Sequence, residues 1–147
     1  MHKTSEVNVL PSVADIMSLM LNLRSDVWLL WGLLATFNTA LIGWLLEKGG
    51  SFRNPQKVVA TMGHALFCLV IAAGFVNTYG NLAAAVNDLD AAIRASSEPA
   101  SGGLIEVFRR RDYTGSLVYA IAVTAISFAF ITSLVWSSFL RKSRGLS

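Results

Sequence analysis

Three apolar runs without Asp, Glu, Lys or Arg dominate this sequence, at residues 27–46, 58–76 and 117–140. About 20 apolar residues in a helix are enough to cross a hydrocarbon core of about 30 Å. Each run therefore has the length and the composition of a transmembrane helix. We expect an all-α integral membrane protein with three transmembrane helices, preceded by a short amphipathic N-terminal helix.

The composition of the whole chain fits this expectation. It is 54% hydrophobic and 14% charged, whereas about 25% of the residues in a typical soluble domain are charged. A disordered chain and most soluble folds are thereby excluded. The net charge is +3, but the basic side chains lie near span ends, where membrane lipids are the expected partner and nucleic acid is not. The candidate headgroup contacts are Arg109, Arg110, Arg111, Arg141, Lys142 and Arg144.

We expect one membrane domain, 1–147; the connection 47–57 is a short turn between antiparallel helices, with no room for a second domain. Apolar residues at helical spacing before the first run predict the amphipathic helix, which would lie in the membrane interface or against the neighbouring helices. Ser12 is its expected N-cap, and Ser25-Asp26 is the expected cap of the first span. The predicted parts are 1–26 (tail and amphipathic helix), 27–46 (first span), 55–94 (a long helix with the second span at 58–76), 95–116 (loop and return segment), 117–140 (third span) and 141–147 (basic tail).

The second helix carries one continuous seam. Its spacing alternates four and three, which is the heptad pattern of a coiled coil. Small residues line the membrane half of the seam, where they let helices approach closely in lipid, and larger apolar residues line the rest. We expect the last turns of this helix to project beyond the bilayer, and the seam to bind a second copy or a larger membrane-protein partner. The seam consists of Thr61, Ala65, Cys68, Ala72, Phe75, Tyr79, Leu82, Val86, Leu89 and Ile93.

A second pattern is a layer of polar residues at one depth of the three spans. His64 is the only ionisable group well inside a run, away from its ends, besides the thiol of Cys68. Counting residues from one end of each span predicts that Asn38, His64, Thr132 and Ser133 lie at a similar depth. Such a layer handles protons or ions, or it joins helices by hydrogen bonds, and the second interpretation is favoured. His64 and Cys68 alone are too few for a metal site, so no metal or cofactor is expected.

The charges outside the spans give a weak prediction of orientation. Lysine and arginine are equally frequent on the two sides, but those on the side of residues 47–57 and the C-terminal tail are closer together. The positive-inside rule then favours an N-outside, C-inside protein, although Arg109–Arg111 argue for the reverse. We expect an integral protein of a bacterial inner (plasma) membrane.

The sequence contains no H-E-x-x-H, G-x-S-x-G, P-loop or dinucleotide motif, and we expect no enzyme and no catalytic residues. The seam and the small-residue faces favour a self-associating scaffold or an accessory subunit of a membrane complex. The alternative is an oligomeric pore or channel, holin-like or a stress effector, with its polar layer at Asn38 and His64.

Overall fold

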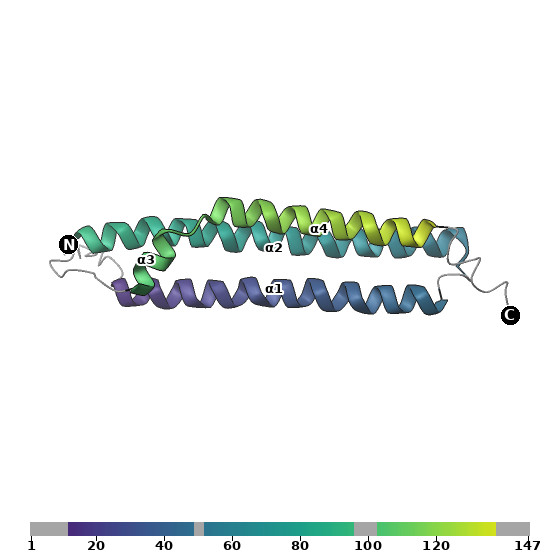
Figure 1. Cartoon of the computed structure of the whole chain (residues 1–147), viewed down its shortest axis with the longest axis horizontal. Helices are drawn as coiled ribbons and strands as arrows, with labels where there is room; N and C mark the ends of the chain where they lie inside the picture. The colour runs from purple at the N-terminus through teal and green to yellow at the C-terminus, as the bar shows by residue number, and fades with distance from the viewer. Residues whose placement is uncertain (1–11, 49–51, 96–102, 138–147) are drawn as a thin grey trace, which may run out of the picture.

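The computed structural model describes residues 12–48, 52–95 and 103–137, and these ranges contain four helices and no strand. The helices are α1 (Val13–Lys48), α2 (Asn54–Ala95), α3 (Gly103–Arg109) and α4 (Tyr113–Trp136). Figure 1 shows the three long helices lying lengthwise beside one another, with the short α3 at one end. All three are long and apolar enough to cross a membrane. This confirms the predicted all-helical class and its three candidate spans.

The first helix differs from the prediction, because α1 runs without a break from Val13 to Lys48. Ser25 and Asp26 are exposed inside it and cap no new helix. The reason is that one buried stripe, which includes Met20 and Val27, continues across the predicted boundary. Residues 13–26 are therefore the first turns of α1, and not a separate helix.

The start of α1 is fixed by a reciprocal pair of hydrogen bonds. The backbone N–H of Asp15 donates to Oγ of Ser12 at 3.2 Å, and the N–H of Ser12 donates to the Asp15 carboxylate at 3.3 Å. Such a capping box satisfies two backbone donors that have no partner within the helix. Ser12 is thus the N-cap that the sequence indicates.

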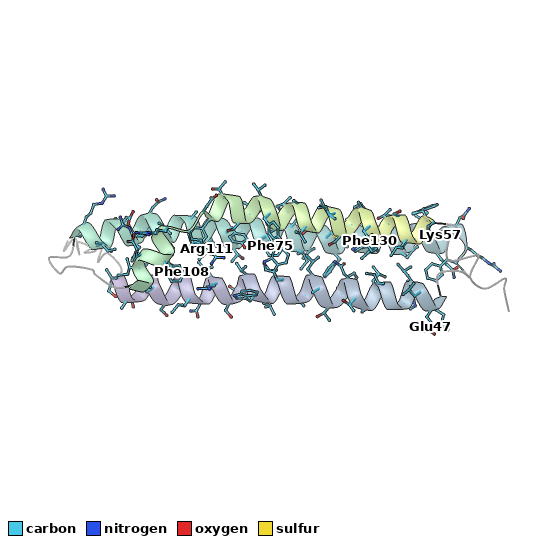
Figure 2. The ribbon with its side chains drawn as sticks, viewed as in Figure 1. Glu47, Lys57, Phe75, Phe108, Arg111 and Phe130 are labelled. Carbon is cyan, nitrogen blue, oxygen red and sulfur yellow. The ribbon has the colours of Figure 1, made fainter. Side chains whose placement is uncertain are left out.

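The central helix of the bundle is α2, which packs against both α1 and α4, whereas α1 and α4 touch each other little. It extends one residue beyond the predicted 55–94 at each end. Phe75 and Leu89 of α2 are fully buried, as is Met20 of α1, and Figure 2 shows Phe75 between the helices. The core therefore follows the length of α2 and is built from one side of each neighbour.

The predicted loop and return segment, 95–116, contains α3, which packs against the end of α2. Phe108 of α3 is 2% exposed within the main hydrophobic core. Nε of Arg109 lies 2.8 Å from a carboxylate oxygen of Asp90 on α2. An apolar anchor and an ion pair thus dock a helix of only seven residues.

The last long helix begins at Tyr113, before the apolar run that starts at residue 117. The carboxylate of Asp112 accepts the N–H of Gly115 at 2.9 Å, so Asp112 caps α4 and brings its first turn forward. The helix ends at Trp136. The predicted end of the third span, at 138–140, and the basic tail lie outside the described residues.

At the opposite end of the bundle, α4 is fastened to the start of α2. The indole N–H of Trp136 donates to Oγ1 of Thr61 at 3.1 Å. The ammonium of Lys57 lies 5.7 Å from the centre of the same indole ring, which is a cation–π distance. Figure 2 shows Lys57 at this end, far from Phe108 and α3.

Candidate functional site

The predicted seam of α2 faces the other helices of the same chain. All ten of its side chains are buried or half-buried in the isolated chain. Phe75 contacts Trp31 of α1 with ring centroids 4.9 Å apart, and Cys68 faces α4 across a gap lined by Thr124 and Phe128. The register of the seam therefore describes packing within one chain, and in this structure it is not a surface open to a second molecule.

The polar layer brings two of its four predicted residues together. Nε2 of His64 lies 3.2 Å from Oδ1 of Asn38, which joins α2 to α1 inside the apolar length of the bundle. Because a carbonyl oxygen only accepts, the ring carries its proton on Nε2 in this arrangement. Sγ of Cys68, one turn further along α2, lies 3.4 Å from the same nitrogen. The observed cluster is thus Asn38, His64 and Cys68.

The other two residues of the predicted layer stay outside this cluster. The hydroxyl of Thr132 is buried without a hydrogen-bond partner among the described residues, and Ser133 is exposed on the outer side of α4. Successive residues of a helix point about 100° apart, so Thr132 and Ser133 cannot both face the interior. Counting residues along the span predicts the depth of these two side chains in the bundle, but it does not predict the direction in which each of them points.

Aromatic rings enclose the imidazole. Phe37 stacks near it at 6.2 Å between ring centroids, and Phe128 of α4 lies at 5.6 Å. His64 is 2% exposed, and its Nδ1 is buried with no partner in the described part of the chain. The site therefore has one satisfied and one unsatisfied ring nitrogen in an apolar shell.

Metal binding finds no support in this arrangement. Among the described residues, no three His, Cys, Asp or Glu side chains gather closely enough to hold an ion. The cluster supplies one imidazole and one thiol, whereas structural zinc sites use four ligands. Its chemistry is that of a hydrogen bond between helices.

The predicted headgroup arginines do not act as one group. Arg109 pairs with Asp90, and Arg110, the residue after α3, pairs with Glu106 of α3 at 2.6 Å. Arg111 instead lines a cavity at the α3 end of the bundle. Arg141, Lys142 and Arg144 lie outside the described residues.

Two polar residues of that cavity were not predicted from the sequence as site residues. They are Arg24 of α1 and Tyr113, the first residue of α4. Arg24 precedes the first apolar run and Tyr113 precedes the third, so both lie at the same level of an antiparallel bundle. Their positions just before these two runs could therefore have indicated, from the sequence alone, that Arg24 and Tyr113 lie close together.

No family model matches this chain, and neither a curated protein nor a solved structure is similar to it.

Proposed function

We propose that this chain is a small multi-pass membrane protein that self-associates as a scaffold, with α1 as its contact helix. The observation that carries the proposal is the outer side of α1 over three turns of its apolar run. Every side chain on this arc is small and exposed, and it points away from α2. We call this surface the α1 small face; it consists of Gly32, Ala35, Thr36, Thr39, Ala40 and Gly43.

Small side chains have a specific value in lipid. Lipid tails are as apolar as leucine, so helices associate there through close packing, which small residues allow. Bulky apolar side chains are the ordinary lipid-facing choice, and α2 exposes several of them, including Met62, Leu66 and Leu69. The α1 small face lacks such side chains, which favours a helix of another molecule as its neighbour.

The outer side of α4 is a weaker candidate. It carries Ala122, Ala125 and Ala129, but Ile126 and Phe130 stand among them at 68% and 56% exposure. These two side chains would keep a second helix at a distance. We therefore assign the contact to α1, and a parallel pair of α1 helices about a twofold axis is the simplest closed arrangement.

The same proposal includes the placement of the bundle. The first turns of α1 and the last turns of α2, together with α3, lie beyond the hydrocarbon. Charged side chains of these helices are frequent in these turns. At about 1.5 Å per residue, the 42 residues of α2 span ~63 Å, about twice the hydrocarbon thickness. The orientation stays N-outside. A Ser18→Cys variant labelled by an impermeant maleimide in intact cells tests this, since Cys68 is buried.

The double variant Gly32→Leu/Gly43→Leu tests self-association. A Cβ at either position meets nothing within 4 Å, so the fold of the single chain accepts leucine there. Leucines on the contact helix would hold two copies apart. We expect the dissociation constant of the oligomer to be at least tenfold higher than that of the wild type. The measurement is the mass of the protein in mild detergent by light scattering, over a series of protein-to-detergent ratios.

The matched control is Gly63→Leu, on the bulky outer side of α2, where a Cβ also meets nothing within 4 Å. It should leave the mass unchanged. A wild-type chain that stays monomeric at every ratio would refute the scaffold proposal. A monomer bound to a larger membrane protein would instead make the chain an accessory subunit.

The pore alternative receives less support. Asn38 and His64 face the inside of a single bundle, where Phe37 and Phe128 cover the imidazole. An oligomer formed through the α1 small face would not place these polar groups around its axis. The hydroxyls of Thr36 and Thr39 alone make a poor lining for an ion path.

A further inference from the structure

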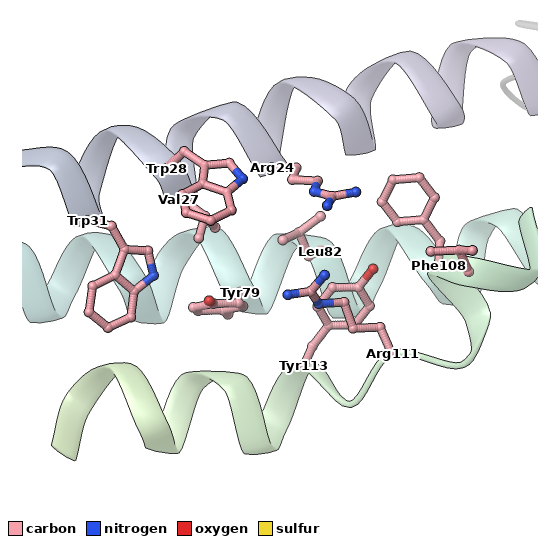
Figure 3. A pocket seen from close by; sticks show the side chains of 10 residues that line it. Arg24, Val27, Trp28, Trp31, Tyr79, Leu82, Phe108, Arg111 and Tyr113 are labelled. Carbon is pink, nitrogen blue, oxygen red and sulfur yellow. The ribbon is translucent and has the colours of Figure 1, made fainter. Parts of the chain in front are cut away.

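A cavity of about 90 Å³ lies where α1, α2, α3 and the start of α4 meet. Figure 3 shows Arg24 entering it from α1 and Arg111 from the segment before α4, with Leu82 of α2 between them. One water needs only about 10–15 Å³, so the space accepts a group of several atoms. Two cationic side chains thus border a cavity whose floor is apolar.

Neither of the two arginines that border the cavity has a partner of opposite charge among the described residues. Within the described ranges, no carboxylate lies within salt-bridge distance of Arg24 or Arg111. Their neighbours Arg109 and Arg110 are both paired, with Asp90 and Glu106. Two guanidinium groups that face one cavity without a counter-ion favour an anion between them.

A second observation comes from Tyr113. Its side chain is 8% exposed, and its hydroxyl is buried with no hydrogen-bond partner in the described part of the chain. Figure 3 shows the hydroxyl directed from the start of α4 toward the α1 side of the cavity. A buried donor that lacks a partner costs free energy, and an anionic oxygen in the cavity would remove this cost.

The cavity continues into a wider groove of about 710 Å³ between α1 and α4. Trp28, Trp31 and Tyr119 line this groove, and Trp28 is 67% exposed. Asp112 also borders it, but its carboxylate accepts the N–H of Gly115 as the cap of α4. Aromatic rings are the usual companions of lipid chains just below the headgroups.

We propose that this cavity and groove bind an anionic phospholipid. The phosphodiester lies between the guanidinium groups of Arg24 and Arg111 and accepts the hydroxyl hydrogen of Tyr113. One acyl chain follows the groove along Trp28, Trp31 and Tyr119 into the hydrocarbon. The cavity lies at the depth expected for lipid headgroups, because the apolar runs of α1 and α4 begin there. The proposal does not rest on self-association, because none of the six residues of the α1 small face lines the cavity or the groove.

The test uses the full chain in nanodiscs of phosphatidylcholine with a minor fraction of phosphatidylglycerol. The protein is extracted into mild detergent, and native mass spectrometry gives the amount of each lipid retained. We expect phosphatidylglycerol to be retained preferentially. Arg24→Gln and Arg111→Gln should each reduce that retention about tenfold, since each removes a charge-assisted hydrogen bond. Tyr113→Phe, which keeps the ring, should reduce it about threefold.

Arg109→Gln and Arg110→Gln are the matched controls, because they remove the same charge from the same end of the bundle. They should leave retention unchanged. Equal losses in all four arginine variants would overturn the site, since they would indicate attraction by net charge alone. Circular dichroism of each variant confirms that the helices are intact, and Arg24→Lys, which keeps the charge, should recover part of the retention.

A second arm distinguishes a lipid from a free anion. Inorganic phosphate is added to the detergent-solubilised protein before mass measurement. We expect it to leave bound phosphatidylglycerol in place, because phosphate makes no contact with the aromatic groove. Displacement of the lipid by phosphate at comparable concentration would overturn the lipid assignment and identify a small-anion site.

Discussion

Nε2 of His64 on α2 and Oδ1 of Asn38 on α1 lie 3.2 Å apart inside the apolar length of the bundle. This contact joins two helices whose other contacts at this level are apolar. Asn38→Leu should lower the free energy of unfolding by about 1 kcal/mol, because a buried ring nitrogen loses its partner. Asn77→Leu is the control, since Asn77 is exposed on α2. The measurement is a denaturant titration in detergent followed by circular dichroism.

The double variant Asn38→Leu/His64→Leu sharpens this prediction. Removing both partners leaves no unsatisfied polar group, so its cost should be smaller than the sum of the two single costs. The expected coupling is about 0.6 kcal/mol, the average for hydrogen bonds between membrane helices. Strictly additive costs would show that the two side chains do not interact.

The bond from Trp136 to Thr61 should contribute to the docking of α4 on α2. Trp136→Phe removes the indole donor and weakens the cation–π contact with Lys57. We expect a loss of about 1 kcal/mol in the free energy of unfolding. Trp44→Phe is the matched control, because Trp44 is exposed to a similar degree, 46% against 48% for Trp136, and its ring contacts Phe52 and not Thr61 or Lys57. If both tryptophan variants lose the same amount, the Trp136 bond has no stabilising role.

The three spans could be predicted because a helix without charges over about 20 residues has few stable alternatives to crossing a bilayer. The helix ends were harder to predict, since a single side chain decides each of them. Asp112 brings the start of α4 forward, and the stripe through Met20 and Val27 carries α1 past Ser25-Asp26.

The seam of α2 shows what a periodic pattern leaves open. Alternate spacings of three and four identify the residues that share one face. That face can pack against helices of the same chain as well as against helices of a second chain. Leu82 and Leu89 are buried within this chain. Which helix packs against a seam depends on the arrangement of the whole bundle, and the spacing pattern of one helix does not identify it.

Apolar burial should hold α3 in place more strongly than its ion pair does. Phe108→Ala removes a side chain that is 2% exposed, at an expected cost of about 3–5 kcal/mol. Asp90→Asn breaks the pair with Arg109, whose side chain is 48% exposed, and should cost at most about 1 kcal/mol. Hydrogen exchange of residues 103–109 reports the opening of α3 directly. Faster exchange in Asp90→Asn than in Phe108→Ala would reverse this order.

Two glycines of α2 should respond differently to alanine. Gly80 lies in the interior of α2 with an open position for a Cβ, so Gly80→Ala should raise the free energy of unfolding by about 0.5–1 kcal/mol through helix propensity. A Cβ on Gly74 would lie 2.9 Å from Cδ2 of Leu30 on α1. Gly74→Ala should lose that gain, because Leu30 is half-buried between the helices and has to move. Thermal unfolding of both variants in one detergent makes the comparison, and an equal gain in both would show that α1 does not approach α2 closely at Gly74.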